Sequence, residues 1–318
     1  QDWTLANGPF TESDFAALSD KNWTLLVQDV EKHYAPLQAL MQQFKFIPQW
    51  RLDDLMISYA ATGGSVGPHV DQYDVFLLQA EGKRRWQIAC SFEPDLLEDC
   101  PLNTLKRFNP EQEWVLEPGD MLYLPPNIAH HGVALEPGMT WSIGSRAPSA
   151  ADLLQGLGEW LAFSGHEGGR YSDPGLKSQV RAGEIDRHAL QNLRKMMVSA
   201  IDEHQDMDNY LAAFMSRFRL AHDPMPPPAM IDPEKLVTEL QSGATLLRNP
   251  WTRLCWVEDN NCARLYAAGQ AYDCSVGLAE ALCESDHARV QADILDRASL
   301  DTLVKLIYIV HFLLSEPG

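Results

Sequence analysis

The sequence predicts an α+β protein in which a β-barrel is followed by helices and then by a small domain of mixed structure. Residues 50–147 alternate short apolar segments with turns that contain Gly and Pro, which is typical of a β-sandwich or barrel. After Pro148 the apolar residues recur every three to four positions, which indicates amphipathic helices. The proline-rich segment 223–228 is expected to be a stiff, extended linker. We therefore expect domains at residues 1–148, 149–222 and 229–318, joined by the linker at 223–228.

Four strands are the clearest in the barrel region, because β-branched and aromatic residues stand there between turns. They are expected at residues 73–78, 85–89, 121–124 and 140–144. The third of these strands follows a tight Pro-Gly-Asp turn, which requires positive φ at Gly119. Upstream, residues 11–18 and 23–44 have a largely helical pattern, and we expect them to cover one face of the barrel.

Three helices are expected in the region 149–222, beginning near Ser149, Arg187 and Met207. In the first of them, four leucines and a tryptophan are spaced to form one apolar stripe. Because no strands separate the three helices, the pattern predicts a small bundle or a dimerisation arm.

The C-terminal region begins with Asp232 as the N-cap of a helix whose first residue is Pro233. Short strands are expected near residues 245–247, 254–257 and 263–266, and helices near 278–283 and 300–314. This order of helix, β-wing and helix suggests a winged-helix domain.

The charge of the chain argues against a nucleic-acid partner. The net charge is −19, from 44 acidic residues against 25 Lys and Arg, whereas a nucleic-acid footprint requires clustered basic residues. From residue 229 to the end, 13 acidic residues stand against 7 Lys and Arg. The winged helix is therefore expected to contact protein or to be structural, and an acidic enzyme attracts basic protein surfaces.

The cysteines and the start of the chain indicate a cytoplasmic protein. The 6 cysteines are scattered without a Cys-x-x-Cys pair, as expected in a reducing compartment. No apolar run reaches the length of a membrane span, and the N-terminus lacks a signal sequence. The chain begins at Gln1 rather than at Met, so we expect the N-terminal part of the first domain to be missing.

Histidine and aspartate residues in the barrel region have the pattern of a metal site. His69 and Asp71 are separated by one residue, so on an extended segment they point to the same side and can hold one ion. A third ligand must come from another strand. His130 and His131 compete for this role, because adjacent strand residues face opposite ways. Two imidazoles and one carboxylate form the facial triad of non-haem Fe(II) enzymes, which leaves three coordination positions open.

These segments together resemble a JmjC/cupin-type 2-oxoglutarate oxygenase, and most closely the bacterial YcfD-type ribosomal oxygenases. The resemblance covers nearly the whole chain and is most specific at residues 53–58, 67–78, 82–86, 116–130 and 144–148. It implies a double-stranded β-helix (cupin/JmjC) barrel, a helical region through which two copies form a homodimer, and a C-terminal winged-helix domain. It also selects His130 as the third ligand, since the Pro-Pro-x-x-x-His pattern of the family ends there.

The same resemblance implies an activity and a co-substrate site. The expected enzyme is a dioxygenase that uses Fe(II), 2-oxoglutarate and O2 to hydroxylate an arginine of a ribosomal protein, protein sixteen of the large subunit, as an arginine 3-hydroxylase. Arg84 stands where relatives place the basic residue that binds the distal carboxylate of 2-oxoglutarate. Arginine suits this role because it pairs with carboxylates through two parallel hydrogen bonds. Lys83 and Arg85 face the other way on a strand and are expected to be exposed.

The substrate side follows partly from strand periodicity. Asp54, Met56 and Ser58 share one face of a strand by the period of two. A carboxylate there can pair with a guanidinium, and methionine can line its aliphatic stem. Matched position by position, the resemblance implies that the arginine pocket is formed by Asp54, Met56, Tyr73 and Ser142.

Other functions use parts of the same pattern. A histidyl hydroxylase or a demethylase of the same family would keep the triad but has little need of Asp54, because a neutral imidazole requires no carboxylate. A non-enzymatic cupin and winged-helix regulator would require a basic recognition helix, which the sequence lacks. A cupin isomerase that binds Zn(II) or Mn(II) would usually add a fourth ligand and would not require Arg84.

Overall fold

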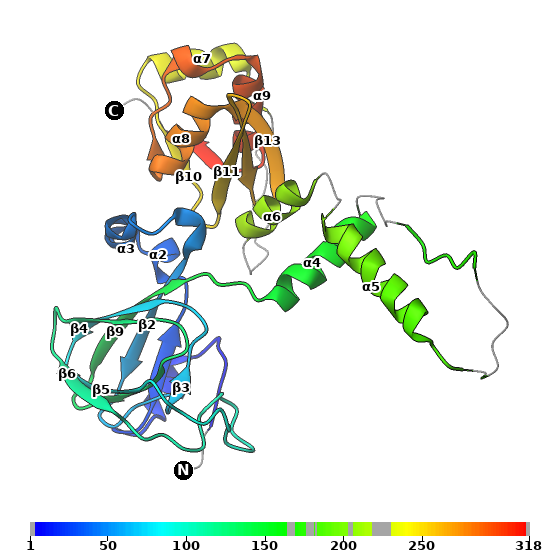
Figure 1. Cartoon of the computed structure of the whole chain (residues 1–318). Coiled ribbons are helices and arrows are strands. Elements are labelled where there is room, and N and C mark those ends of the chain that lie inside the picture. Colours follow the sequence, from blue (N-terminus) through cyan, green and yellow to red (C-terminus); the bar gives the residue numbers. More distant parts are fainter. Residues whose placement is uncertain are drawn as a thin grey trace. The chain divides into compact units, whose positions relative to one another are not determined.

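The computed structural model describes residues 4–163, 169–175, 181, 183–202, 206–217 and 230–315. It contains two compact units, Gln1–Ala147 and Pro148–Gly318, which are described separately below (Figure 1). The linker expected at 223–228 lies outside the described residues. No described helix combines the length and the apolar character that crossing a membrane would require.

The first unit is a barrel of two antiparallel sheets that face each other (Figure 1). The larger sheet has the strand order β1-β2-β9-β4-β7 and the smaller one the order β3-β8-β5-β6. The strands of the larger sheet are β1 (Thr24–Val27), β2 (Leu52–Ala60), β9 (Gly138–Ser145), β4 (Val75–Glu81) and β7 (Met121–Leu124). Those of the smaller sheet are β3 (His69–Val70), β8 (Ala129–Ala134), β5 (Arg84–Ala89) and β6 (Gln112–Leu116).

The alternation of the strand residues decides what lies inside the barrel. Along β4, Val75 and Leu77 are buried and pack with Trp86, Leu116 and Leu124 between the sheets. The intervening Phe76 belongs to a second apolar cluster with Leu55 and Ile143 of the larger sheet and with Leu37 and Phe44 from the helical segments. This pattern is the double-stranded β-helix that the sequence analysis expected.

Short helices precede most of the barrel strands, and those within residues 30–44 pack on the larger sheet. They are α1 (Glu12–Ala16), α2 (Val30–His33) and α3 (Ala35–Met41), with 3₁₀ turns η1 (Gln42–Phe44) and η2 (Gln49–Arg51). The prediction that residues 23–44 are largely helical is wrong at its start, because Thr24–Val27 pairs with β2 as an edge strand. The backbone groups of this strand pair with β2, a distant partner that local periodicity does not reveal.

The second unit combines helices with two small sheets. Its first helices are α4 (Ala150–Phe163), α5 (Arg187–Asp202) and α6 (Met207–Ser216). A buried core then unites α7 (Pro233–Gln241), α8 (Val276–Glu284) and α9 (Arg297–Tyr308) with the strands. The strands are β10 (Leu246–Arg248), β14 (His287–Ala288) and β15 (Phe312–Leu314) in one sheet, and β11 (Leu254–Asp259), β12 (Cys262–Ala267) and β13 (Gln270–Ser275) in the other. A short 3₁₀ turn, η3 (Ala292–Ile294), precedes α9.

The start of α7 agrees with the sequence prediction, whereas the end of α9 does not. The Asp232 side chain accepts hydrogen bonds from the amides of Glu234 and Lys235, which is the N-cap expected for α7. The helix expected near 300–314 is too long, since α9 ends at Tyr308 and Val310 has φ of 58°. That left-handed residue reverses the chain into β15, which pairs with β10.

Candidate active site

The strand pair β3–β8 brings together the metal-binding residues that the sequence suggested. His69 on β3 lies directly opposite His130 on β8 in the antiparallel register. Asp71 follows β3, and its carbonyl oxygen accepts a hydrogen bond from the amide of Asn127 at 2.9 Å. Asn127 has φ of 65°, a conformation that asparagine tolerates better than most residues. The turn before β8 therefore holds the backbone of Asp71 next to His130.

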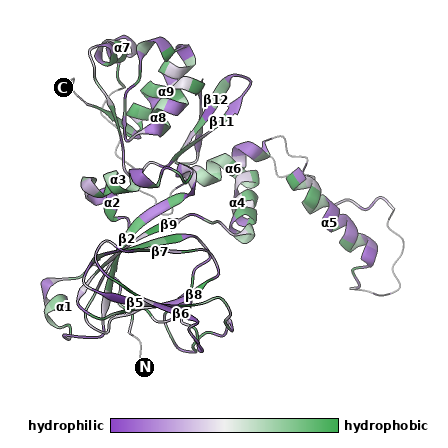
Figure 2. Ribbon diagram, turned by 60° about the vertical axis from the view of Figure 1, so that its left-hand side comes forward, coloured by the Kyte–Doolittle hydropathy of each residue, from purple (hydrophilic) through white to green (hydrophobic). Residues whose placement is uncertain are grey.

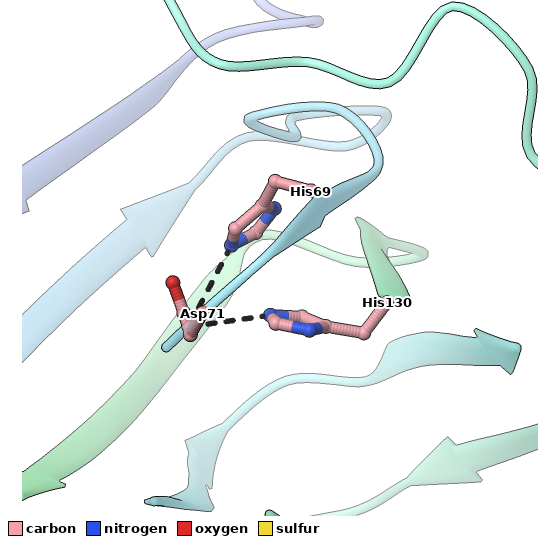
Figure 3. Close-up of side chains that lie close together, drawn as sticks. All are labelled: His69, Asp71 and His130. Carbon is pink, nitrogen blue, oxygen red and sulfur yellow. Dashed lines mark ion pairs between the residues drawn. The ribbon is translucent and has the colours of Figure 1, made fainter. Parts of the chain in front are cut away.

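The three side chains converge on one point (Figure 3). The Oδ2 atom of Asp71 lies 4.0 Å from Nε2 of His69 and 3.6 Å from Nε2 of His130. One ligand atom from each residue lies within 4.8 Å of the other two. Among the described residues, this is the only group of at least three His, Cys, Asp or Glu side chains close enough to hold a metal ion.

Hydrogen bonds to the backbone orient both imidazoles. The Nδ1–H of His69 donates to the carbonyl of Gly67, and that of His130 donates to the carbonyl of Ile128, each at 3.0 Å. Since Nδ1 of each ring is engaged with the backbone, Nε2 is the atom that faces Asp71 and can serve as a metal ligand. Burial, together with the nearby charge of His69, lowers the pKa of His130 to about 4, so this ring is neutral at neutral pH.

His131 does not take part in this cluster. Its register partner on β5 is Gln87, and its ring packs edge-on against Phe108 at a centroid distance of 6.0 Å. The alternation of side chains along β8 therefore places His130 and His131 on opposite faces.

Arg84 on β5 is a buried cation inside the barrel. Its side chain donates to the hydroxyl groups of Ser58 and Thr140 at 3.1 and 3.3 Å and to the carbonyl of Gly132 at 3.5 Å. The residue is 4% exposed, and burial lowers its pKa to about 10. No carboxylate of the described residues pairs with it, and its Nε has no partner. Because a buried charge without a counter-ion is unfavourable, the site is suited to an anionic ligand.

Trp86 links this cation to the metal-binding cluster. The guanidinium of Arg84 lies 5.0 Å from the centre of the Trp86 ring, and that ring lies 5.9 Å from the ring of His130. The neighbours of Arg84 in the sequence face outward, since Lys83 pairs with Glu117 and Arg85 lies near Glu113. Of the three adjacent basic residues, Arg84 is the one that points into the barrel.

The residues expected to form the substrate pocket lie on β2, β9 and the turn after β3. Met56 and Ser142 are direct register partners. A Cβ atom placed on Gly144 would lie 3.7 Å from Oδ1 of Asp54 and 4.0 Å from the Tyr73 ring, so both side chains border the same glycine. Burial and the negative charges of Asp71 and Asp54 raise the pKa of Tyr73.

The chain is similar to known proteins over most of its length. Residues 39–153 match the family model of the JmjC domain, and residues 199–310 match that of the ROXA-like winged helix. The chain is 35% identical over 274 residues to the ribosomal protein uL16 3-hydroxylase of Escherichia coli, an alignment that covers 85% of this chain and 71% of that protein. The chain belongs to the JmjC-domain ribosomal oxygenases. Its identity to a probable ribosomal oxygenase of Haemophilus influenzae is 32%, over 86% of this chain and 69% of the relative.

Solved structures show the same fold in this family. The crystal structure of E. coli YcfD matches 98% of this chain and covers 84% of that protein, with a TM-score of 0.84 and 32% identity. A second structure of YcfD, in complex with cobalt and 2-oxoglutarate, matches 99% of this chain and 84% of that protein, with a TM-score of 0.81 and 32% identity. The JmjC barrel and the winged helix predicted from the sequence are thereby confirmed.

The residues present fit the groups that this family employs. Two imidazole Nε2 atoms and one carboxylate suit a divalent iron ion. Sequence reasoning missed that Ser58 and Thr140 bind Arg84. The facing of Ser58 was predictable from its spacing to Met56, whereas Thr140 gave no local signal.

Proposed function

We propose that this chain is an Fe(II)- and 2-oxoglutarate-dependent oxygenase that hydroxylates an arginine side chain of ribosomal protein uL16. The observation that carries the proposal is the pairing of two features inside one barrel. One is the convergence of His69, Asp71 and His130. The other is the buried cation of Arg84, which pairs with no carboxylate among the residues that the structure describes. A non-enzymatic regulator or a cupin isomerase would not require a buried guanidinium such as that of Arg84.

Each part of the site has a role in this reaction. His69, Asp71 and His130 would hold Fe(II), and the guanidinium of Arg84 would bind the distal carboxylate of 2-oxoglutarate. The bound iron and 2-oxoglutarate supply the oxidation of the C–H bond by O2, with release of succinate and CO2. The Ser58 and Thr140 hydroxyls hold the guanidinium in place, so little rearrangement is needed when the co-substrate enters.

The substrate arginine would lie against β2 and β9. The carboxylate of Asp54 is 8% exposed and borders Gly144 together with Tyr73. A carboxylate at this depth forms a strong, charge-assisted pair with a guanidinium, and Met56 can line the methylene groups. The net charge of −19 favours encounters with a basic ribosomal protein. Asp54 also favours arginine over a neutral histidine as the target residue.

We expect Asp54→Asn to damage hydroxylation of a uL16 peptide while sparing the metal and co-substrate sites. The amide replaces one carboxylate oxygen by NH₂, so the bidentate pair loses both its charge and its geometry. The loss of a charged hydrogen bond, about 1.5–3 kcal/mol, predicts about a ten- to hundredfold lower kcat/KM. Mass spectrometry of the +16 Da peptide product measures hydroxylation, and succinate release without peptide measures the intact co-substrate site.

A matched control is Asp120→Asn, which changes an aspartate of an exposed turn in the same barrel. If Asp54→Asn hydroxylated the arginine peptide as well as the wild type, the pocket assignment would be wrong. The metal site and the Arg84 site would be unaffected by that outcome.

We further propose that the region 149–222 forms a homodimer through α5. None of the residues of this helix is buried within the chain, although Leu190, Leu193, Met197 and Ile201 are spaced to form one stripe. Their exposed fractions range from 36% for Leu193 to 65% for Met197. Figure 2 shows hydrophobic residues interleaved with hydrophilic ones along α5. Pairing with a second copy would bury this stripe.

The winged-helix domain has more acidic than basic residues. We therefore propose that it makes no direct contact with nucleic acid.

We expect the double variant Leu193→Glu/Met197→Glu to be monomeric, because two charges in an apolar helix interface cannot be buried without partners. Light scattering coupled to size-exclusion chromatography measures the molar mass directly. The control is Ser199→Glu, which adds a charge on the opposite face of the same helix. A double variant with the mass of the wild type would exclude the α5 stripe as the interface.

A further inference from the structure

The pairing of strand β2 with β9 shifts register next to Asp54, the residue proposed to bind the substrate arginine. Leu52 pairs with Ser145 and Leu55 with Ile143, so β2 contains one more residue than β9 over this interval. Such a β-bulge bends the strand and redirects a side chain, and bulges are frequent beside active sites. The extra residue falls at Asp53 or Asp54, and the regular register resumes at Leu55.

The neighbouring strand leaves the sheet at the same level. Strand β1 pairs with β2 from Thr24 opposite Ala60 to Val27 opposite Ile57. If this register continued, Asp29 would lie opposite Leu55. Asp29 instead adopts φ of 58°, which ends the strand and begins the short helix α2. A residue with a Cβ atom adopts positive φ less readily than glycine does, so contacts around Asp29 hold it in this conformation.

Carboxylates replace the missing strand hydrogen bonds at this level. The amide of Leu55 donates to Oε2 of Glu31 at 3.0 Å, and the amide of Asp29 donates to Oδ2 of Asp54 at 3.3 Å. The turn 29–32 therefore binds both the backbone that follows the bulge and the side chain of Asp54.

Lys32 forms ion pairs with two carboxylates of the turn 29–32. Its Nζ lies 2.5 Å from Oδ1 of Asp29 and 2.8 Å from Oε1 of Glu31, and the side chains of all three are at most 10% exposed. Removing charged groups from water is unfavourable in free energy. Apolar residues of the same volume often stabilise a fold as well as a buried ion pair does. A charged arrangement at this position therefore suggests a need for fixed geometry rather than for stability alone.

We propose that the turn 29–32 is a positioning element that fixes the carboxylate of Asp54 for recognition of the substrate arginine. Glu31 holds the backbone after the bulge, Lys32 holds Glu31, and the amide of Asp29 orients Asp54. This proposal rests on the proposed function, since it assumes that Asp54 binds the guanidinium. None of the three residues would touch the substrate, so each acts through Asp54.

Binding of two uL16 peptides to the Co(II)- and 2-oxoglutarate-loaded enzyme tests this role. One peptide carries the target arginine and the other has alanine in its place. Glu31→Ala removes the acceptor of the Leu55 amide, and we expect the Kd of the arginine peptide to rise about tenfold, with that of the alanine peptide unchanged. Glu31→Gln keeps an acceptor oxygen and should restore most of the affinity. Succinate release without peptide should stay at the level of the wild type in both variants.

Two further variants keep the test decisive. Lys32→Met retains the length of the side chain and removes its charge, so the same loss is expected if Glu31→Ala does not fold. Leu37→Ala disturbs the apolar contacts of the same helical layer without removing a polar contact of the turn, and should leave the difference between the two peptides intact.

The outcomes separate this proposal from the proposed function. If Asp54→Asn weakens arginine binding but the Glu31 and Lys32 variants do not, the turn has no positioning role. The positioning role is also excluded if the Glu31 and Lys32 variants weaken the binding of both peptides equally. It is likewise excluded if Leu37→Ala weakens binding of the arginine peptide as much as they do. If Asp54→Asn itself leaves arginine binding unchanged, the pocket assignment fails first.

Discussion

The variants His69→Ala, Asp71→Ala and His130→Ala are each expected to lose iron-dependent conversion of 2-oxoglutarate to succinate down to background. Each change removes one of the three ligand residues whose atoms converge within 4.8 Å, so a bound ion would lose one of these three contacts. His131→Ala should keep most of the activity, because the ring of His131 packs on Phe108 away from the cluster. Succinate formation with added Fe(II), measured by mass spectrometry, gives the comparison.

Calorimetric titration with Co(II) separates loss of the metal from loss of the fold. The three ligand variants should bind Co(II) far more weakly than the wild type, with circular dichroism spectra that remain the same. An inactive His131→Ala together with an active His130→Ala would reverse the assignment made from the register of β8.

The second large effect is expected for Arg84→Ala, which should raise the apparent KM for 2-oxoglutarate about ten- to hundredfold, in keeping with about 1.5–3 kcal/mol for a charged hydrogen bond. In the wild type the guanidinium is buried and pairs with no carboxylate in the described part of the chain, so we expect it to bind the distal carboxylate of the co-substrate. The pKa of Arg84, lowered by burial to about 10, still leaves the group charged at neutral pH. Arg84→Lys should give an intermediate KM, because lysine keeps the charge without the planar fork.

Arg85→Ala is the matched control, since it removes a neighbouring guanidinium whose side chain is 39% exposed. A thermal shift gives a second readout: 2-oxoglutarate should stabilise the metal-loaded wild type and Arg85→Ala but have little effect on Arg84→Ala. A KM for Arg84→Ala within about threefold of the wild type, well short of the loss expected for a charged hydrogen bond, would move the carboxylate-binding role to another residue.

The two sites lie next to each other on the smaller sheet, where β5 carries Arg84 and Trp86 and β8 carries His130. Trp86 contacts both the guanidinium of Arg84 and the ring of His130, so the co-substrate site and the metal site share one wall. Substitution of Trp86 would therefore disturb both, whereas an Arg84 variant changes only the co-substrate site and a His130 variant only the metal site.

Strand periodicity explains why parts of the site could be predicted from the sequence. His69 and Asp71, like Met56 and Ser58, are two residues apart, so an extended backbone alone places each pair on one side. The facing of Arg84 between Lys83 and Arg85 follows from the same rule once the register is known. Near Asp54, however, the β-bulge interrupts the period of two, and the hydrogen bonds of the turn 29–32 decide where the carboxylate lies.

The segment 23–44 shows where local reasoning fails. Its apolar spacing is compatible with a helix, yet Thr24–Val27 is an edge strand because β2 offers it backbone hydrogen bonds. The helix α2 begins only after Asp29 turns the chain with a left-handed φ. A similar residue, Val310, ends the last helix region before β15. Local propensity cannot compete with pairing partners that lie far away in the sequence.

The sequence by itself determined the residue types of the proposed triad, their spacing on extended segments, the alternation of Arg84 with Lys83 and Arg85, and the order of the domains. The tertiary structure alone decided the partners of these groups, such as Ser58 and Thr140 around Arg84 and the turn 29–32 beside Asp54. The physical reason is that facing along a strand is a property of neighbouring residues. Burial and cross-strand contacts instead depend on how distant strands pair and on which charges that pairing removes from water.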